Sequence, residues 1–177
     1  MTQKGKTTIR DITLVAVWAA LTFAAKLVLA PIANVELVSL LLTVFTVVMG
    51  LERGICAALV FTTLTVFESA YYGAGDWIVL YYINWPLLTL LSRAFLNKES
   101  SETRAAILLG LFGLLFDIPS TGIKLVLFGP GYAVAYLISG IPFDAIHGAA
   151  NFISALFLYR PLVRHLEKTR QHMEQTR

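Results

Sequence analysis

Residues 78–127 read IVLYYINWPLLTLLSRAFLNKESSETRAAILLGLFGLLFDIPSTGIKLVL. Two apolar runs, at 78–97 and 105–127, flank the polar segment NKESSETR, which contains Lys98 and Arg104. Each run has the roughly 20 residues that a helix needs to cross a hydrocarbon core about 30 Å thick. The stretch therefore predicts two membrane-spanning helices joined by a short polar loop.

The same pattern continues outward to both ends of the chain. The last apolar run has 29 residues, and at 1.5 Å per residue it would form a helix of about 43 Å, too long for one untilted span. We therefore expect an external loop or short helix near 128–140, with the final span beginning near Pro142, because proline is well tolerated in a first helical turn. The predicted spans are 11–31, 35–51, 54–72, 78–97, 105–127 and 140–162.

The positive charges are distributed asymmetrically over this pattern. Of 14 Lys and Arg residues, only Lys26 and Lys124 fall outside the segments that would share one side of the membrane. Positive residues near span ends are retained in the cytoplasm. The sequence therefore predicts a multi-pass protein of the cell membrane with both termini in the cytoplasm. The charges on that side are Lys4, Lys6, Arg10, Arg53, Arg93, Lys98, Arg104, Arg160, Arg164, Lys168, Arg170 and Arg177.

Composition leaves no room for a separate soluble domain. The chain has 177 residues, of which 57% are hydrophobic and 14% are charged, against about 25% charged residues in a soluble domain. We expect one all-α integral membrane domain over 1–177, with a frayed cytoplasmic helix at 163–177. The net charge of +3 is assigned to flanks that face anionic lipid, and no nucleic-acid partner is expected. The single cysteine, Cys56, excludes an internal disulfide and is expected to be a small packing residue.

Polar and aromatic residues gather in the predicted external half of the spans, whereas the cytoplasmic half is nearly all aliphatic and Phe. Polar groups inside a membrane are costly unless they face protein or water. A pocket open to the outside, with apolar walls and a few polar groups, is therefore predicted. Its candidate ligand-binding residues are Asn34, Glu36, Glu68, Tyr71, Trp77, Tyr81, Asn84, Trp85, Lys124, Tyr132, Tyr136, Asp144, His147 and Asn151.

Several of these residues have simpler alternative explanations. Lys26 could form a structural ion pair with Glu36 or Glu68, and the aromatic residues could be an ordinary interfacial belt. Asp144, His147 and Asn151 follow the i, i+3, i+7 spacing that puts them on one helical face, which favours a ligand-facing or network role. Further His or Cys ligands near this face are lacking, so no metal site is predicted.

The sequence contains no motif for ATP binding or for common hydrolytic catalysis. Gly-x-Ser-x-Gly, His-Glu-x-x-His and a phosphate-binding Gly-Lys-Ser/Thr loop are all absent. We expect no enzyme activity and no intrinsic cofactor. Any ATP-driven step would have to be supplied by partner subunits.

Ala16, Ala20 and Ala24 recur every four residues and form a smooth strip on one face of the first span. Small residues at this spacing allow another helix to approach closely within lipid. The strip therefore predicts docking to a partner helix. The alternative is packing against another helix of the same chain.

Six spans, both ends inside, an Ala-x-x-x-Ala strip and an external aromatic pocket together resemble the S components of energy-coupling factor (ECF) vitamin transporters. The segments NVELVSLL at 34–41, GLFGLLF at 110–116 and ISGIPFDAIHGAAN at 138–151 look like the subgroup that includes the cobalamin-specific S component of lactobacilli. The patterns of the riboflavin, thiamine and folate members are not found in this chain.

The resemblance implies a substrate-binding subunit of an ATP-driven uptake system. Such a subunit binds a vitamin from outside and docks through its first helix onto a transmembrane T component, and two cytoplasmic ATPase subunits drive the complex. The S component is thought to topple in the membrane to deliver its ligand. Cobalamin is the ligand that the resemblance favours.

For cobalamin, Tyr and Trp faces could pack on the macrocycle, and Asn34, Asn84 and Asn151 could exchange hydrogen bonds with its amides. Glu68, Lys124 and Asp144 would orient pocket residues or meet polar ligand groups.

Three alternatives stay open. The ligand could be pantothenate, α-ribazole or another B vitamin. The chain could instead be a small intramembrane enzyme that uses Asp144 and His147 as an acid–base pair, or a purely structural membrane subunit.

Overall fold

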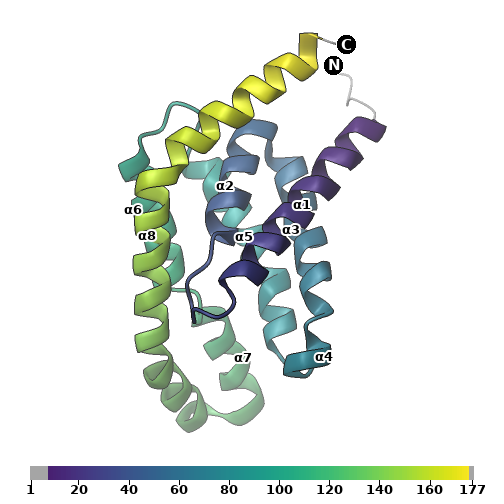
Figure 1. The fold of residues 1–177 in the computed structure, drawn as a ribbon. Coiled ribbons are helices and arrows are strands. Elements are labelled where there is room, and N and C mark those ends of the chain that lie inside the picture. Colours follow the sequence, from purple (N-terminus) through teal and green to yellow (C-terminus); the bar gives the residue numbers. More distant parts are fainter. Residues whose placement is uncertain (1–7, 176–177) are drawn as a thin grey trace, which may run out of the picture.

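The computed structural model describes residues 8–175, which form a bundle of α-helices (Figure 1). Lys4, Lys6 and Arg177, three of the positive residues assigned to the cytoplasmic side, lie outside the described residues. The helices are α1 (Ile9–Leu29), α2 (Val38–Met49), α3 (Leu51–Val66), α4 (Ser69–Tyr72), α5 (Trp77–Phe95), α6 (Glu102–Leu114), α7 (Ile118–Phe128) and α8 (Pro130–Gln175).

Helix α1 begins with a capping box. The Thr8 hydroxyl accepts a hydrogen bond from the Asp11 N–H, and the Asp11 carboxylate accepts one from the Thr8 N–H at 3.0 Å. These bonds satisfy backbone donors that a helix start otherwise leaves unpaired. Asp11 also accepts a 2.9 Å hydrogen bond from Arg53 Nε, so the same carboxylate ties the start of α1 to the start of α3.

Helix α2 is the centre of the bundle, in contact with α1, α3, α5 and α8. All 12 of its residues are buried. Its hydroxyl groups are paired inside the protein: Thr43 and Ser92 share a 2.8 Å hydrogen bond, and Thr46 donates to the Leu42 carbonyl. At about 18 Å, α2 is shorter than a hydrocarbon core. The predicted span 35–51 is thus a shorter helix, Val38–Met49, enclosed by its neighbours.

Helices α6 and α8 approach so closely that glycine is required at their crossing. A Cβ atom on Gly113 would lie 2.8 Å from the Gly148 Cα, and one on Gly148 would lie 2.9 Å from the Gly110 carbonyl oxygen. The contacting atoms are backbone atoms, which cannot move aside as a flexible side chain can. The glycines of the 110–116 and 138–151 segments therefore set the distance between these two helices.

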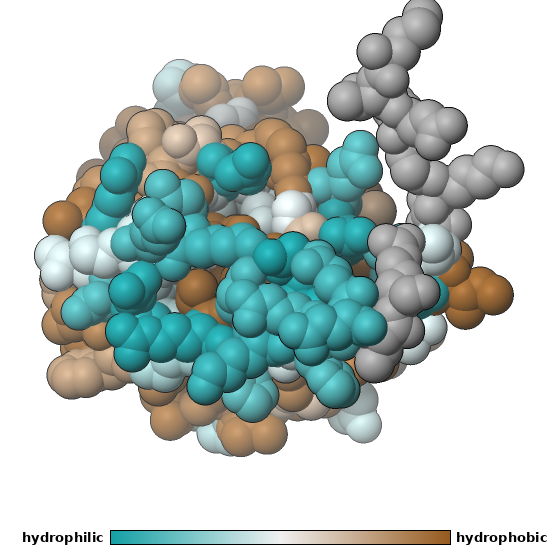
Figure 2. Space-filling model, turned by 90° about the horizontal axis from the view of Figure 1, so that it is seen from above, coloured by the Kyte–Doolittle hydropathy of each residue, from teal (hydrophilic) through white to brown (hydrophobic). Residues whose placement is uncertain are grey.

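The sides of the bundle are apolar. Five helical segments, namely α1, Leu51–Tyr71, α5, Glu102–Phe128 and α8, are long and apolar enough to cross a membrane. Val28, Val126 and Phe157 expose 77%, 84% and 69% of their surface, which would be unfavourable in water but suits contact with lipid. Figure 2 shows hydrophilic side chains gathered over one end, with hydrophobic side chains around them. The fold is compatible with a helical membrane bundle.

Both described ends of the chain lie at the same end of the bundle (Figure 1). Arg10, Arg53, Arg93, Lys98 and Arg170, which the sequence assigns to one side of the membrane, line one cavity at this end. The turns after α4 and α7 lie at the other end (Figure 1), and the turn after α1 lines a cavity together with Tyr71 of α4. The alternation of connections between two ends is as predicted, and the cytoplasmic location of the first end stays a prediction.

The segment 128–140, expected to be an external loop or short helix before a span starting near Pro142, is instead mostly part of one longer helix. Gly129, at φ +83°, ends α7, and Pro130 begins a single helix that continues through Pro142 to Gln175. The proline in the first turn of this helix is Pro130, and not Pro142 as predicted. A continuous helix keeps nearly all backbone groups paired, which a break inside lipid would not. At 46 residues, or about 69 Å, α8 also includes the predicted sixth span and the expected frayed tail as regular helix.

Two other boundaries differ from the prediction. The connection between the predicted spans 35–51 and 54–72 is Gly50 alone, at φ +96°, because α3 already begins at Leu51. The predicted fifth span, 105–127, divides into α6 and α7 around 115–117. Figure 1 also shows α8 bending as it enters its yellow C-terminal part. Pro161 lies inside this helix and accounts for the bend, since helix kinks usually occur at proline.

The small residues of α1 lie on its outer side. Ala16, Ala20 and Ala24 are exposed, whereas Ala19 and Thr22 are the buried residues of this helix. The strip is therefore not used for packing within the described chain. Cys56 is exposed on α3, so its expected role as a packing residue is wrong.

Candidate functional site

A cavity of about 880 Å³ opens at the end of the bundle opposite the one where the hydrophilic side chains gather. Its walls come from the turn after α1, the end of α3 with α4, the first turns of α5, the break between α6 and α7, and the N-terminal part of α8. Five separate parts of the sequence thus converge on one space.

Ten of the fourteen residues predicted to bind a ligand line this cavity. They are Asn34, Glu36, Glu68, Tyr71, Trp77, Tyr81, Trp85, Tyr136, Asp144 and His147. Asn34 lies in the turn after α1 at φ +58°, a left-handed conformation that asparagine tolerates better than most residues.

Asn84 and Asn151 lie in the protein interior and not at the cavity wall. Asn84 Nδ2 donates a 2.8 Å hydrogen bond to the Phe116 carbonyl, which belongs to the break between α6 and α7. Asn151 Nδ2 donates to Ser39 Oγ at 3.1 Å, which joins α8 to α2. The two amides therefore hold the elements that form the cavity, whereas the sequence suggested that they exchange hydrogen bonds with a ligand.

Lys124 and Tyr132 also lie outside the cavity wall. Lys124 forms an ion pair with Asp76, which does line the cavity, and its ammonium group lies 5.2 Å from the ring centre of Tyr136. Tyr132 is half exposed and packs on Phe128, with 4.9 Å between ring centres.

His147 contacts Glu36 at the cavity wall. Its Nε2 lies 3.2 Å from Glu36 Oε1, and the other oxygen of Glu36 accepts a 2.8 Å hydrogen bond from the Ser39 N–H. The pair connects the turn after α1 to α8, residues 111 positions apart in the sequence. His147 thus has Glu36 as its hydrogen-bond partner and not Asp144, its predicted acid–base partner.

The suggested ion pair of Lys26 with Glu68 is present, and both side chains line the cavity. The pair joins α1 to the end of α3. Because both groups are largely buried, the loss of either would leave an uncompensated charge in an apolar environment, which is strongly unfavourable.

Trp77, Tyr81, Trp85 and Phe116 form a connected cluster of rings. Successive ring centres lie 5.6 Å apart for Trp77 and Tyr81, 5.5 Å for Tyr81 and Trp85, and 5.2 Å for Trp85 and Phe116. Phe116 in turn lies 4.9 Å from the His147 ring. Aromatic rings prefer such edge-to-face and tilted arrangements. The cluster gives the cavity a rigid aromatic wall.

Trp85 contributes more to stability than its predicted ligand role implies. It is 2% exposed and touches the rings of Phe61, Tyr81, Phe112 and Phe116. Trp85→Ala is expected to lower the free energy of unfolding by about 3–5 kcal/mol, as for other large buried aromatic residues. Thermal melts of the purified protein would measure this loss.

Trp85→Phe is the matched control for this substitution. The Trp85 indole N–H has no hydrogen-bond partner among residues 8–175, so phenylalanine keeps most of the ring packing and gives up no hydrogen bond within them. Equal losses for alanine and phenylalanine would contradict a packing role.

Several residues of the cavity were missed by sequence reasoning. Phe116 and Asp117 occupy the break between α6 and α7, and Ser120 and Phe143 lie further along the two walls. Asp117 was visible as a carboxylate in an apolar run, which is the signal that could have found it. From the sequence alone, Phe116 and Phe143 cannot be distinguished from phenylalanines that face lipid.

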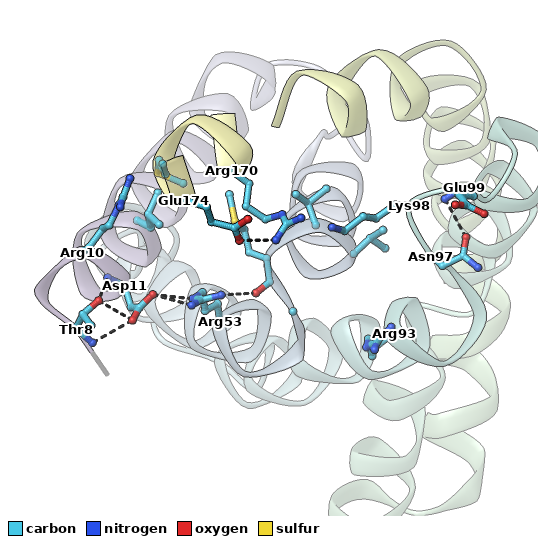
Figure 3. A pocket seen from close by; sticks show the side chains of 16 residues that line it. Thr8, Arg10, Asp11, Arg53, Arg93, Asn97, Lys98, Glu99, Arg170 and Glu174 are labelled. Carbon is cyan, nitrogen blue, oxygen red and sulfur yellow. Dashed lines mark hydrogen bonds and ion pairs between the residues drawn. The ribbon is translucent and has the colours of Figure 1, made fainter. Parts of the chain in front are cut away.

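A second cavity, of about 590 Å³, lies at the hydrophilic end (Figure 3). Four of its eight charged residues are paired with one another: Arg53 Nη2 lies 2.8 Å from Asp11, and Arg170 Nη1 lies 2.6 Å from Glu174. Beyond the predicted span, hydrogen bonds from Arg170 and Lys98 lower the pKa of Glu167 to about 2. The two cavities share no lining residue, and the buried helix α2 lies between them.

Within residues 8–175, no group of three or more His, Cys, Asp and Glu side chains is arranged to hold a metal ion. Comparison of the chain with protein-family models, with curated proteins and with solved structures finds no match.

Proposed function

We propose that this chain is the substrate-binding S component of an ECF-type vitamin transporter, and that it captures its ligand from outside the cell. The observation that carries the proposal is the one-ended cavity. It opens at the end opposite the basic residues, and buried Leu40, Leu42, Val44 and Phe45 of α2 lie between it and the other end. A cavity that apolar residues close toward the other end suits a receptor that binds its ligand from one side and needs partner subunits to release it on the other.

Cobalamin is the best candidate ligand. The cavity of about 880 Å³ is near the upper end of the range of about 300–1,000 Å³ that is usual for small-molecule sites. The aromatic wall formed by Trp77, Tyr81 and Phe116 offers ring faces and edges to a ligand with a broad ring. The similarity of the 138–151 segment to the cobalamin-specific subgroup supports the same choice.

The partners would be the T component in the membrane and two ATPase subunits in the cytoplasm. The chain has no ATP-binding loop, so energy must come from such partners. The exposed strip of Ala16, Ala20 and Ala24 is the proposed contact with the T component, since small residues permit close helix approach in lipid. Toppling of the subunit would then carry the cavity toward the cytoplasm.

Binding of radiolabelled cobalamin to the purified subunit, without partners, tests the proposal. Saturable binding at one site per chain is the expected result. Binding of only another B vitamin would keep the transporter role and change the ligand. Absence of any saturable ligand would favour a structural subunit, and turnover of a substrate without ATPases would favour an enzyme.

Trp77→Ala and Tyr81→Ala are expected to weaken ligand binding by about 0.5–1.5 kcal/mol for each lost aromatic contact. Both rings line the cavity and are only partly buried, so they can reach a ligand without being essential to the core. Titration calorimetry on detergent-purified protein would measure the change. Trp18→Ala is unsuitable as a control because Trp18 donates to the Leu41 carbonyl and stacks on Phe45. An unchanged dissociation constant for both cavity variants would move the binding site elsewhere.

A further inference from the structure

Negative charge exceeds positive charge around the cavity, and this imbalance restricts the ligand. Five carboxylates line it, whereas two lysines and one histidine are the cations that lie within it or pair with its wall. The carboxylates are Glu36, Glu68, Asp76, Asp117 and Asp144, and the cations are Lys26, Lys124 and His147. Even with His147 protonated, two negative charges stay uncompensated.

Each of the three cations already has a carboxylate partner. Lys26 pairs with Glu68, and Lys124 pairs with Asp76. His147 lies 3.2 Å from Glu36. These pairs hold neighbouring elements together, as described above, so none of the cations is free to neutralise a further carboxylate. Asp117 and Asp144 are the two that stay without an ion-pair partner among residues 8–175.

Asp117 and Asp144 lie on adjacent walls of the same part of the cavity. Asp117 Oδ2 would lie 3.2 Å from a Cβ atom on Gly140, so this carboxylate rests against α8 one turn before Asp144. The Tyr136 hydroxyl accepts a 3.1 Å hydrogen bond from Ser120, and both residues line the same cavity. Both side chains are neutral, so they do not cancel the charge of Asp117. Asp144 has no hydrogen-bond partner of its own among the described residues.

An uncompensated carboxylate in a largely apolar cavity is unfavourable until something neutralises it or donates hydrogen bonds to it. The aromatic wall adds to this preference, because the faces of tryptophan and tyrosine rings attract cations. Trp77, Tyr81 and Phe116 line the same cavity as the two carboxylates. Both features favour the same kind of ligand group.

We infer that the ligand presents a positive charge or a group of N–H donors to Asp117 and Asp144, and that anionic vitamins are rejected. This inference rests on the proposed function and narrows its substrate class. Of the ligands considered from the sequence, pantothenate carries a carboxylate and is disfavoured. Cobalamin, with its many primary amides, and the cationic α-ribazole both satisfy the two carboxylates.

Thermal-shift and calorimetric titration of the purified full chain in detergent tests the inference with four probes. Cyanocobalamin and α-ribazole offer amide donors and a positive charge, whereas pantothenate and biotin offer a carboxylate. At least one of the first two is expected to bind and the last two are not. Asp117→Asn and Asp144→Asn should each weaken the bound probe at least tenfold, because a neutral amide removes the charge that favours it.

Glu99→Gln is the matched control, since Glu99 is an exposed carboxylate at the opposite end of the bundle. It should bind the probe as the wild type does. Asp144→Glu keeps the charge and should retain most of the affinity, which separates loss of charge from loss of fold. Melting of each variant without ligand checks that the fold is intact.

The outcomes separate this inference from the proposed function. Saturable binding of pantothenate or biotin, or full affinity in both asparagine variants, would overturn the charge requirement alone and leave a vitamin-binding subunit. Failure of all four probes and of the other B vitamins to bind would overturn the proposed function and this inference with it.

Discussion

If the proposed transporter role is correct, leucine in place of Ala20 is expected to abolish vitamin uptake by the assembled complex while leaving ligand binding to the isolated subunit unchanged. Ala20 lies on the exposed side of α1, in the middle of the strip that starts at Ala16 and ends at Ala24. A leucine adds bulk where a partner helix must come close, and association in lipid depends on such close packing. The cavity is formed by other residues, so its affinity should not change.

Uptake of radiolabelled vitamin by cells that produce this chain with its T component and ATPases measures the first effect. Ala149→Leu is the matched control, because Ala149 is also exposed but lies on α8. It should transport normally. Substitutions at exposed positions usually change stability by no more than about 0.5 kcal/mol, so both variants should fold. Unimpaired uptake by the Ala20 variant would remove the docking role from the strip.

Valine in place of Gly148 is expected to prevent recovery of the folded protein. A Cβ atom at this position would lie 2.5 Å from Leu114 Cγ and 2.9 Å from the Gly110 carbonyl oxygen. Relief of these contacts requires α6 and α8 to separate, which disrupts the neighbouring pairing of His147 with Glu36 and of Asn151 with Ser39. Overpacking alone costs about 1–3 kcal/mol, and the loss of buried hydrogen bonds adds to it.

Gly148→Ala should show a smaller loss of the same kind, measured as a lower melting temperature by size-exclusion chromatography after heating. Gly122→Ala is the control, because a Cβ atom there meets nothing within 4 Å and Gly122 lies inside α7. Alanine is favoured over glycine in a helix by about 1 kcal/mol, so this variant should be as stable as the wild type or more so. Equal melting of the Gly148 and Gly122 variants would show that the close crossing is not required.

The sequence was most informative where a property depends on local composition. Apolar runs of about 20 residues gave the helical segments, and the positions of Arg53 and Lys98 placed their turns at the same end of the bundle as the termini. Boundaries were less certain. Pro142 looked like a helix start, but neighbouring turns hold α8 together through it, so the break falls at Gly129 instead.

The candidate site was predictable by residue type but not by role. Intramembrane polar residues such as Glu36, Asp144 and His147 were identified because their burial is costly unless they face a cavity or a partner, and they do line the cavity. The same reasoning could not separate them from Asn84 and Asn151, which satisfy their amides within the protein. Amide side chains give the same signal in both situations.

The amino-acid sequence by itself determined the helical architecture with segments long and apolar enough to cross a membrane, the opposite character of its two ends and the absence of an ATP-binding motif, because these follow from hydropathy, charge position and local motifs. Only the tertiary structure decided which carboxylate pairs with which cation, since Lys26 could have met Glu36 or Glu68 at similar cost. The tertiary structure also places Asp117 and Asp144 in one cavity without an ion-pair partner among residues 8–175. Ion pairing depends on distances between helices, and those distances are set by contacts between residues far apart in the sequence, such as the Gly113–Gly148 crossing.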